Sequence, residues 1–147
     1  AIEALGVWNT EEQIPLWISL LKDDAFGVRN KARDVLATTN SPQAAIAIVG
    51  LLEDDRIGSK KALIQMGPVA ESAVIVLLEH PDQFIRSDAS EILGEIGGRD
   101  SMRALKKLAN DPSGITRSVA EKAYYKIEFR LKQEEQNKPS PALERVN

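Results

Sequence analysis

The chain has 147 residues, with 19 basic and 22 acidic side chains, one histidine and no cysteine. This length suffices for one domain with a sizeable core, and the missing cysteines exclude disulfides and thiolate metal sites. A net charge of −3 argues against nucleic-acid binding, which normally needs a strongly basic face. Aromatic residues make up only 5%, so most core candidates are Ala, Leu, Ile and Val, a mixture that favours close helix packing over a sheet sandwich.

The apolar pattern predicts helices throughout, near residues 11–22, 25–38, 42–53, 56–66, 69–79, 83–96, 100–110 and 114–132. Pro15 lies inside the first of these and predicts a kink or a late start. Ser41 followed by Pro42 is typical of an N-cap and first helical position, and Asp100 is the expected cap of a later helix. Gly97 and Gly98 are expected to end the helix before it.

An internal repeat runs through the chain. Its reference alanines stand 31, 30, 27 and 31 residues apart, at Ala1, Ala32, Ala62, Ala89 and Ala120. The residue four positions after each alanine is always apolar or aromatic: Leu5, Leu36, Met66, Leu93 and Tyr124. Short polar links precede the later alanines, and three of the four links are followed by an arginine three residues before its alanine, namely Arg29, Arg86 and Arg117. Such self-similarity predicts stacked helical hairpins.

The first residues, AIEALG, match the middle of a repeat rather than its start. If Ala1 corresponds to Ala32, then residues 1–8 are the end of a second helix whose partner is missing. We therefore expect at least one more repeat before Ala1 in a longer protein.

The runs LLKDDAFGVRNKARDVL, ALIQMGPVAESAVIVLLEH and LLEHPDQFIRSDASEILGEIG resemble the HEAT-repeat family, particularly its short bacterial HEAT-like (bilin-lyase-type) variety. The junction at Gly67-Pro68 is similar to the family's short link between helices. The resemblance implies an all-α, right-handed solenoid of about four hairpins plus a partial N-terminal repeat. The expected domain covers residues 1–132, with repeats at 1–8, 11–38, 42–66, 69–96 and 100–132.

In that family, a link acid and the arginine of the second helix often form a ladder along the array. Asp23 with Arg29 and Asp111 with Arg117 occupy those places here. His80 replaces the acid beside Arg86, and the second repeat offers Ser59 or Lys60 in place of the arginine. We expect an incomplete ladder of exposed or half-exposed pairs, each worth about 0–1 kcal/mol.

The residues give little support for catalysis. His80 is expected to be a solvated link residue, because the sequence offers no second histidine or cysteine to share a metal. Adjacent acids such as Asp54-Asp55 are expected to interact with helix N-termini and water. We predict a non-enzymatic chain without cofactor or metal.

The aromatic residues divide into two groups. Trp8 and Trp17 fall at apolar phases and are expected in the core. Tyr125 and Phe129 lie opposite the apolar stripe of the last helix and are expected to be exposed. From residue 133 onward the chain has two prolines and little apolar content, so residues 133–147 are predicted to be a disordered tail.

The leading functional hypothesis is a non-catalytic protein–protein interaction scaffold whose second helices bind a protein or peptide on a concave face. The candidate surface comprises Asn30, Lys31, Asp34, Asp88, Glu91, Glu95, Lys122, Tyr125 and Phe129. We expect no nucleic-acid partner and no direct membrane insertion, and the cytoplasm is the default location. Two alternatives remain: a bilin-lyase-like enzyme, which the resemblance implies, and a structural spacer.

Overall fold

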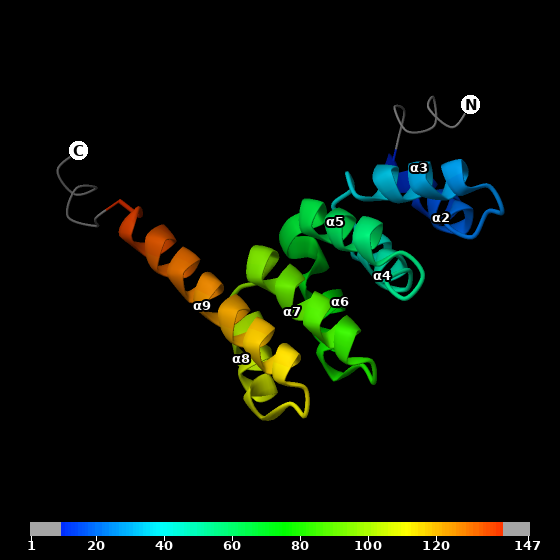
Figure 1. The fold of residues 1–147 in the computed structure, drawn as a ribbon. Helices are drawn as coiled ribbons and strands as arrows, with labels where there is room; N and C mark the ends of the chain where they lie inside the picture. Colours follow the sequence, from blue (N-terminus) through cyan, green and yellow to red (C-terminus); the bar gives the residue numbers. More distant parts are fainter. Residues whose placement is uncertain (1–9, 140–147) are drawn as a thin grey trace, which may run out of the picture.

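The computed structural model describes residues 10–139 of the chain, and all regular elements in that range are helical (Figure 1). The all-α prediction is thereby confirmed for this range. The elements are α2 (Thr10–Leu20), α3 (Phe26–Leu36), α4 (Pro42–Val49), α5 (Arg56–Met66), η1 (Gly67–Ala70), α6 (Glu71–Ile75), η2 (Val76–Glu79), α7 (Gln83–Ile96), α8 (Arg99–Lys106), η3 (Lys107–Asn110) and α9 (Gly114–Gln136), where η marks a 3₁₀ turn. The expected partial repeat at 1–8, including Trp8, lies outside the described residues.

The helices pack as pairs in two layers. Each pair consists of a first helix and the second helix that follows it: α2 with α3, α4 with α5, α6 with α7, and α8 with α9. The second helices α3, α5, α7 and α9 also contact one another in chain order, and so do the first helices α2, α4, α6 and α8. Figure 1 shows the pairs following one another from the blue end to the orange end.

The core lies between the two layers. Leu36 and Leu93, which occupy the apolar position of the repeat, have no exposed surface, and neither do Ile127 and Trp17. Helices α7 and α9 lie close together at Gly94, where an added Cβ would lie 3.2 Å from the backbone of Ala123. A glycine at this position therefore lets α7 and α9 pack closely.

Two local signals are confirmed. The Ser41 side chain accepts a hydrogen bond from the Ala44 amide, with Pro42 at the first helical position. Gly67 has a φ of +74°, which favours glycine, and it ends α5 immediately before the turn that leads into α6. Pro15 does not delay its helix, because α2 already begins at Thr10.

The prediction that Asp100 caps α8 is wrong. The cap comes from Glu71 of the preceding first helix, whose Oε1 accepts hydrogen bonds from the Gly98 amide at 2.8 Å and the Ser101 hydroxyl at 2.7 Å. The Asp100 carboxylate instead lies 3.4 Å from Arg103, and both side chains are exposed. A carboxylate from α6 thus fixes the start of α8, and it ties the third helix pair to the fourth.

The predicted disordered tail begins too early. Helix α9 continues through residues 133–136 and ends at Gln136, where the Asn137 amide donates to the carbonyl of Gln133. The four added residues include Glu134, Glu135 and two glutamines, all of which are good helix formers. Residues 140–147 of the expected tail lie outside the described part of the chain.

Candidate protein-binding surface

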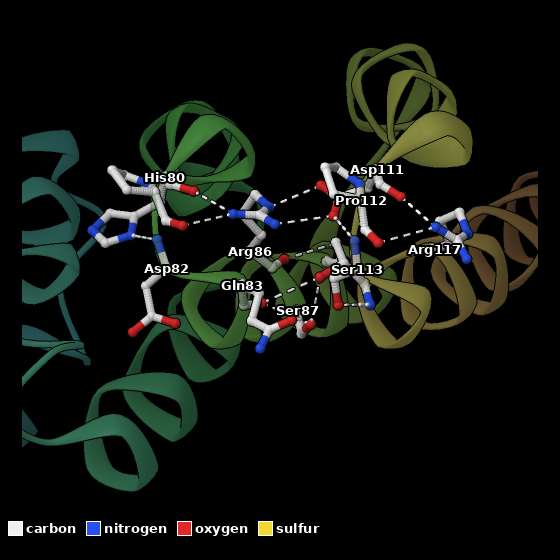
Figure 2. Close-up of polar contacts among 12 residues, drawn as sticks. His80, Asp82, Gln83, Arg86, Ser87, Asp111, Pro112, Ser113 and Arg117 are labelled. Atoms are coloured by element: carbon white, nitrogen blue, oxygen red, sulfur yellow. Dashed lines mark hydrogen bonds and ion pairs between the residues drawn. The ribbon is translucent and has the colours of Figure 1, made fainter.

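Three arginines hold the links between paired helices in the same way. Nη1 of Arg86 donates to the carbonyl oxygens of His80 at 2.8 Å and Pro81 at 2.9 Å (Figure 2). Arg29 makes the equivalent bonds to the two carbonyls of its own link, at 2.7 and 2.8 Å. Arg117 repeats the arrangement with the carbonyls of Asp111 and Pro112. Each arginine therefore fixes the backbone that leads into its own helix.

The expected pairs of Asp23 with Arg29 and Asp111 with Arg117 are wrong in their atoms. The Asp23 carboxylate accepts from the Ala25 amide at 2.8 Å, and its backbone carbonyl is what Arg29 contacts. The Asp111 carboxylate pairs instead with Arg86 of the preceding helix pair, at 2.8 and 3.0 Å. Each arginine of the ladder therefore bonds the backbone carbonyls of its own link. Among the residues that the structure describes, only Arg86 also bonds a carboxylate, that of Asp111 in the next helix pair.

The Arg86–Asp111 pair is more buried than the exposed or half-exposed pairs that we expected, because Asp111 is buried and Arg86 is largely covered. The two side chains are 13% and 5% exposed. The hydrogen bond from Arg86 is the main cause that lowers the pKa of Asp111, and a bond from the Ser113 amide also contributes. A carboxylate held this way stays ionised and rigid, so it fixes the last helix pair against the one before it (Figure 2).

The second repeat is irregular at the same place. Ser59 stands at the arginine position and is fully buried, with no hydrogen-bond partner for its hydroxyl among the described residues. Arg33 of the preceding second helix pairs with Asp55 instead. An added Cβ at Gly58 would overlap both side chains, within 2.3–2.4 Å of their charged atoms. Gly58 therefore makes room for an ion pair that replaces the missing arginine.

His80 is less solvated than predicted. Its side chain is 23% exposed, and its Nε2 lies 2.9 Å from the Glu53 carboxylate. Its Nδ1 accepts a hydrogen bond from the Asp82 amide at 3.0 Å, so Nε2 carries the proton (Figure 2). Within residues 10–139, no group of three or more His, Asp or Glu side chains is arranged to hold a metal ion.

Asp88 does not belong to an exposed face. It is only 5% exposed, and its carboxylate contacts Arg56 at 2.6 Å and Lys60 at 3.5 Å, both on α5. The hydrogen bond to Asp88 and then its charge raise the pKa of Arg56, and Asp82 adds a smaller charge effect. The helical phase of α7 predicts that Asp88 faces away from the core, but side chains of the neighbouring helix α5 cover it.

Three other predicted surface residues, Asp34, Glu91 and Glu95, are exposed but already paired, and Asn30 is half-buried. Glu91 accepts from Lys60 at 2.8 Å, which is the main cause that raises the lysine pKa, and Glu95 pairs with Lys126. Asp34 lies 3.2 Å from Arg33, and Asn30 accepts a hydrogen bond from the same guanidinium. The second helices thus carry a row of ion pairs, and within each pair the opposite charges largely neutralise each other.

Lys31, Lys122, Tyr125 and Phe129 remain exposed, as predicted. Tyr125 is 58% exposed and Phe129 is 67% exposed. The Tyr125 ring packs edge-on against Tyr124 with centroids 5.5 Å apart. Both tyrosines line a groove of about 490 Å³ between α8 and α9, together with Arg117 and Glu121. This end of the second-helix layer offers aromatic surface beside charge.

The sequence-based prediction missed a second set of exposed apolar side chains, which we call the edge row. Each of the four second helices, α3, α5, α7 and α9, contributes one member from its first turn. The members are Phe26, Ile57, Phe84 and Ile115, which are 69%, 83%, 47% and 59% exposed. The intervals between them are 31, 27 and 31 residues, almost those of the repeat alanines. That shared spacing was the available signal, and it places the row along the edge where the links lie.

By length and composition alone, the segment Arg56–Glu79 could cross a membrane. The sequence-based prediction did not identify this segment. Gly67 interrupts it with a non-helical backbone conformation, and a third of the apolar window is buried in the fold. In this structure the segment forms two helices in different layers, α5 and α6.

The sequence matches no protein-family model, and no curated protein has a significantly similar sequence.

Proposed function

We propose that the chain is a non-catalytic protein-binding scaffold, built as a right-handed, HEAT-like solenoid whose second helices face the partner. The observation that carries the proposal is where the exposed apolar side chains lie. Large apolar side chains are exposed at nine described positions, and six of these are on second helices: Phe26, Ile57, Phe84, Ile115, Tyr125 and Phe129. Single exposed apolar residues need no explanation, but a set gathered on one layer is typical of an interaction surface.

Charge supports the same proposal. Most acidic groups predicted to face a partner are neutralised by lysine or arginine on the adjacent second helix, as with Glu95 and Lys126. A surface neutralised in this way gives little long-range attraction for a polyanion. Exposed aromatic and aliphatic side chains then supply the contact area that protein partners bury. The proposed partner is therefore a protein segment.

The inter-helix bonds also suit a rigid scaffold. Ion pairs join α3 to the start of α5, α5 to α7, and α7 to α9, and Arg130 donates to the carbonyls of Gly94 and Gly97. Rigid surfaces lose less conformational entropy on binding. The second helices are therefore expected to present the same surface with and without a partner.

Selection from a phage library of random peptides tests this proposal. The intact chain should enrich peptides that lose affinity when exposed apolar residues of the second helices are changed to serine. Matched changes to serine at Ile46 and Val76 should leave affinity unchanged. These residues are 63% and 72% exposed, which is similar to the second-helix residues, but they belong to the first-helix layer. If no peptide is enriched, or if only the first-helix changes abolish binding, the proposal is wrong.

A further inference from the structure

The edge row is evenly spaced in a way that an extended chain can match. Its members occupy the same position on adjacent, packed second helices. Packed helix axes lie about 8–10 Å apart. An extended segment in the polyproline II conformation has three residues per turn and rises about 3.1 Å per residue, so every third side chain lies on the same face, about 9 Å from the one before. Such side chains would each meet one member of the row.

Two of the row's rings are held in place by arginines. The guanidinium of Arg29 lies 5.8 Å from the centre of the Phe26 ring, and that of Arg56 lies 5.5 Å from the Phe84 ring. Arg29 is itself fixed by two link carbonyls, and Arg56 by Asp88. The rings are thus oriented before any partner arrives, which lowers the entropic cost of docking.

Two grooves lie beside the row. A groove of about 180 Å³ is lined by Phe26 and Leu51, and a second of about 530 Å³ is lined by Ile57. Asp54 and Asp55 line both grooves, so both lie next to the link between α4 and α5. Two apolar members of the row therefore border hollows on either side of these acids.

Exposed acids alternate with the apolar side chains along this edge. Asp24, Asp54 and Asp82 lie in the first three links and are exposed. For these three carboxylates, no lysine, arginine or histidine among residues 10–139 lies within 4.0 Å. Beside the row, Arg56 pairs with Asp88, whereas Arg29 and Arg117 bond only to carbonyls, which do not neutralise their charge. The three free carboxylates outnumber these two cations, so the edge has a small net negative charge.

We propose that the edge row docks an extended peptide segment in the polyproline II conformation, with a large apolar residue at about every third position and lysine or arginine between them. The apolar side chains of the segment would pack against Phe26, Ile57, Phe84 and Ile115, while its basic residues would meet the acids of the links. This inference rests on the proposed protein-binding function, and it specifies the edge of the second-helix layer and the chemistry of the partner.

The first-helix layer offers a contrast. A groove of about 410 Å³ lies between α4 and the turn and helix that follow α5, and it is lined by Ile46, Val49 and Val76. It has no charged lining residue. Its exposed residues therefore serve as controls that match the edge row in size and exposure.

The test uses peptides enriched by the intact chain from a phage library of random peptides, with affinity measured by fluorescence anisotropy. The enriched peptides should show apolar residues with a three-residue period and intervening lysine or arginine. Ile57→Ser and Phe84→Ser should each weaken binding at least about tenfold, equivalent to about 1.4 kcal/mol, and Ile46→Ser should not. Circular dichroism of each variant checks that it is folded.

A second set of variants changes the charge of the edge and leaves its apolar row intact, which tests the role of the acids. Asp54→Lys should weaken binding of the basic peptides severalfold, whereas Glu12→Lys, at an exposed position of α2, should not. Peptides that bind Ile57→Ser and Phe84→Ser at full strength but lose affinity for Tyr125→Ser would overturn this inference and leave the proposed function standing. Failure to enrich any peptide would overturn both.

Discussion

Replacing Arg86 by alanine tests whether the buried pair with Asp111 holds the last helix pair in place. Arg86 donates four hydrogen bonds: two to the carboxylate of Asp111 and two to the link carbonyls of His80 and Pro81. Arg29 provides a matched control within the same chain. It donates to two link carbonyls at nearly the same distances, but it has no carboxylate partner.

The structure gives a magnitude for each change. Arg29→Ala removes two bonds to carbonyls near the surface, which water can replace, so we expect a loss of about 1 kcal/mol. Arg86→Ala removes the equivalent two bonds to the carbonyls of its own link. It also leaves the Asp111 carboxylate, which is 5% exposed, without its cation. Unpairing a buried charge costs about 3–5 kcal/mol. The Ser113 amide still bonds this carboxylate, so we expect the lower end, about 3 kcal/mol in total.

Equilibrium urea unfolding, followed by circular dichroism at neutral pH, measures both variants. The predicted result is that Arg86→Ala lowers the free energy of unfolding by about 2 kcal/mol more than Arg29→Ala does. If the two variants agree within about 0.5 kcal/mol, which is the size of an ordinary surface effect, then the Asp111 pair contributes nothing beyond the carbonyl bonds. The reasoning about this pair would then be refuted.

Three further predictions use the same unfolding assay. Leu93→Ala should cost about 2–5 kcal/mol because it opens a cavity at a fully buried site, and a loss below about 1 kcal/mol would contradict the core assignment. Glu71→Ala should cost about 1–2 kcal/mol through the lost cap of α8, whereas Asp100→Ala should change stability by less than about 0.5 kcal/mol; equal losses would refute the cap assignment. Because the pKa of Asp111 is lowered in the fold, its ionised carboxylate stabilises the fold at pH values above the ordinary aspartate pKa of about 4, and this contribution fades as the pH falls below that value. Asp111→Asn should therefore show a shallower loss of stability than the unmodified chain between about pH 4 and pH 2, and parallel curves would argue against this role.

Local patterns in the sequence predicted most of the helices. The repeat spacing placed Leu36 and Leu93 in the core, and Ser41 was recognised as a cap because its partner is only three residues away. The junction at Gly67 was predictable because a glycine followed by proline limits the backbone directly. Features of this kind depend on residues that are neighbours in the chain.

The errors arose where the partner is distant in sequence. Asp88 was assigned to the surface from the phase of its own helix, but Arg56, 32 residues earlier, covers it. Glu71 caps a helix 27 residues ahead, and helix periodicity carries no information about that contact. The end of α9 was missed because a polar, helix-forming stretch was interpreted from its composition alone.

The candidate surface was predicted only in part. The exposure of Tyr125 and Phe129 follows from helical phase and is confirmed. The edge row was missed because each member, taken singly, is an ordinary apolar residue near a helix start. Only the alignment of Ile57 with Phe84 and Ile115 reveals the pattern, and the structure shows that all of them are exposed.

Hydrogen–deuterium exchange of the intact chain, with and without a peptide enriched by it, shows which helices bind the peptide. We expect slower amide exchange in the second helices, α3, α5, α7 and α9, strongest in their first turns and the preceding links, with α2, α4 and α8 unchanged. Protection confined to the first helices, or no protection at saturating peptide, would contradict the claim that the second-helix layer is the protein-binding surface.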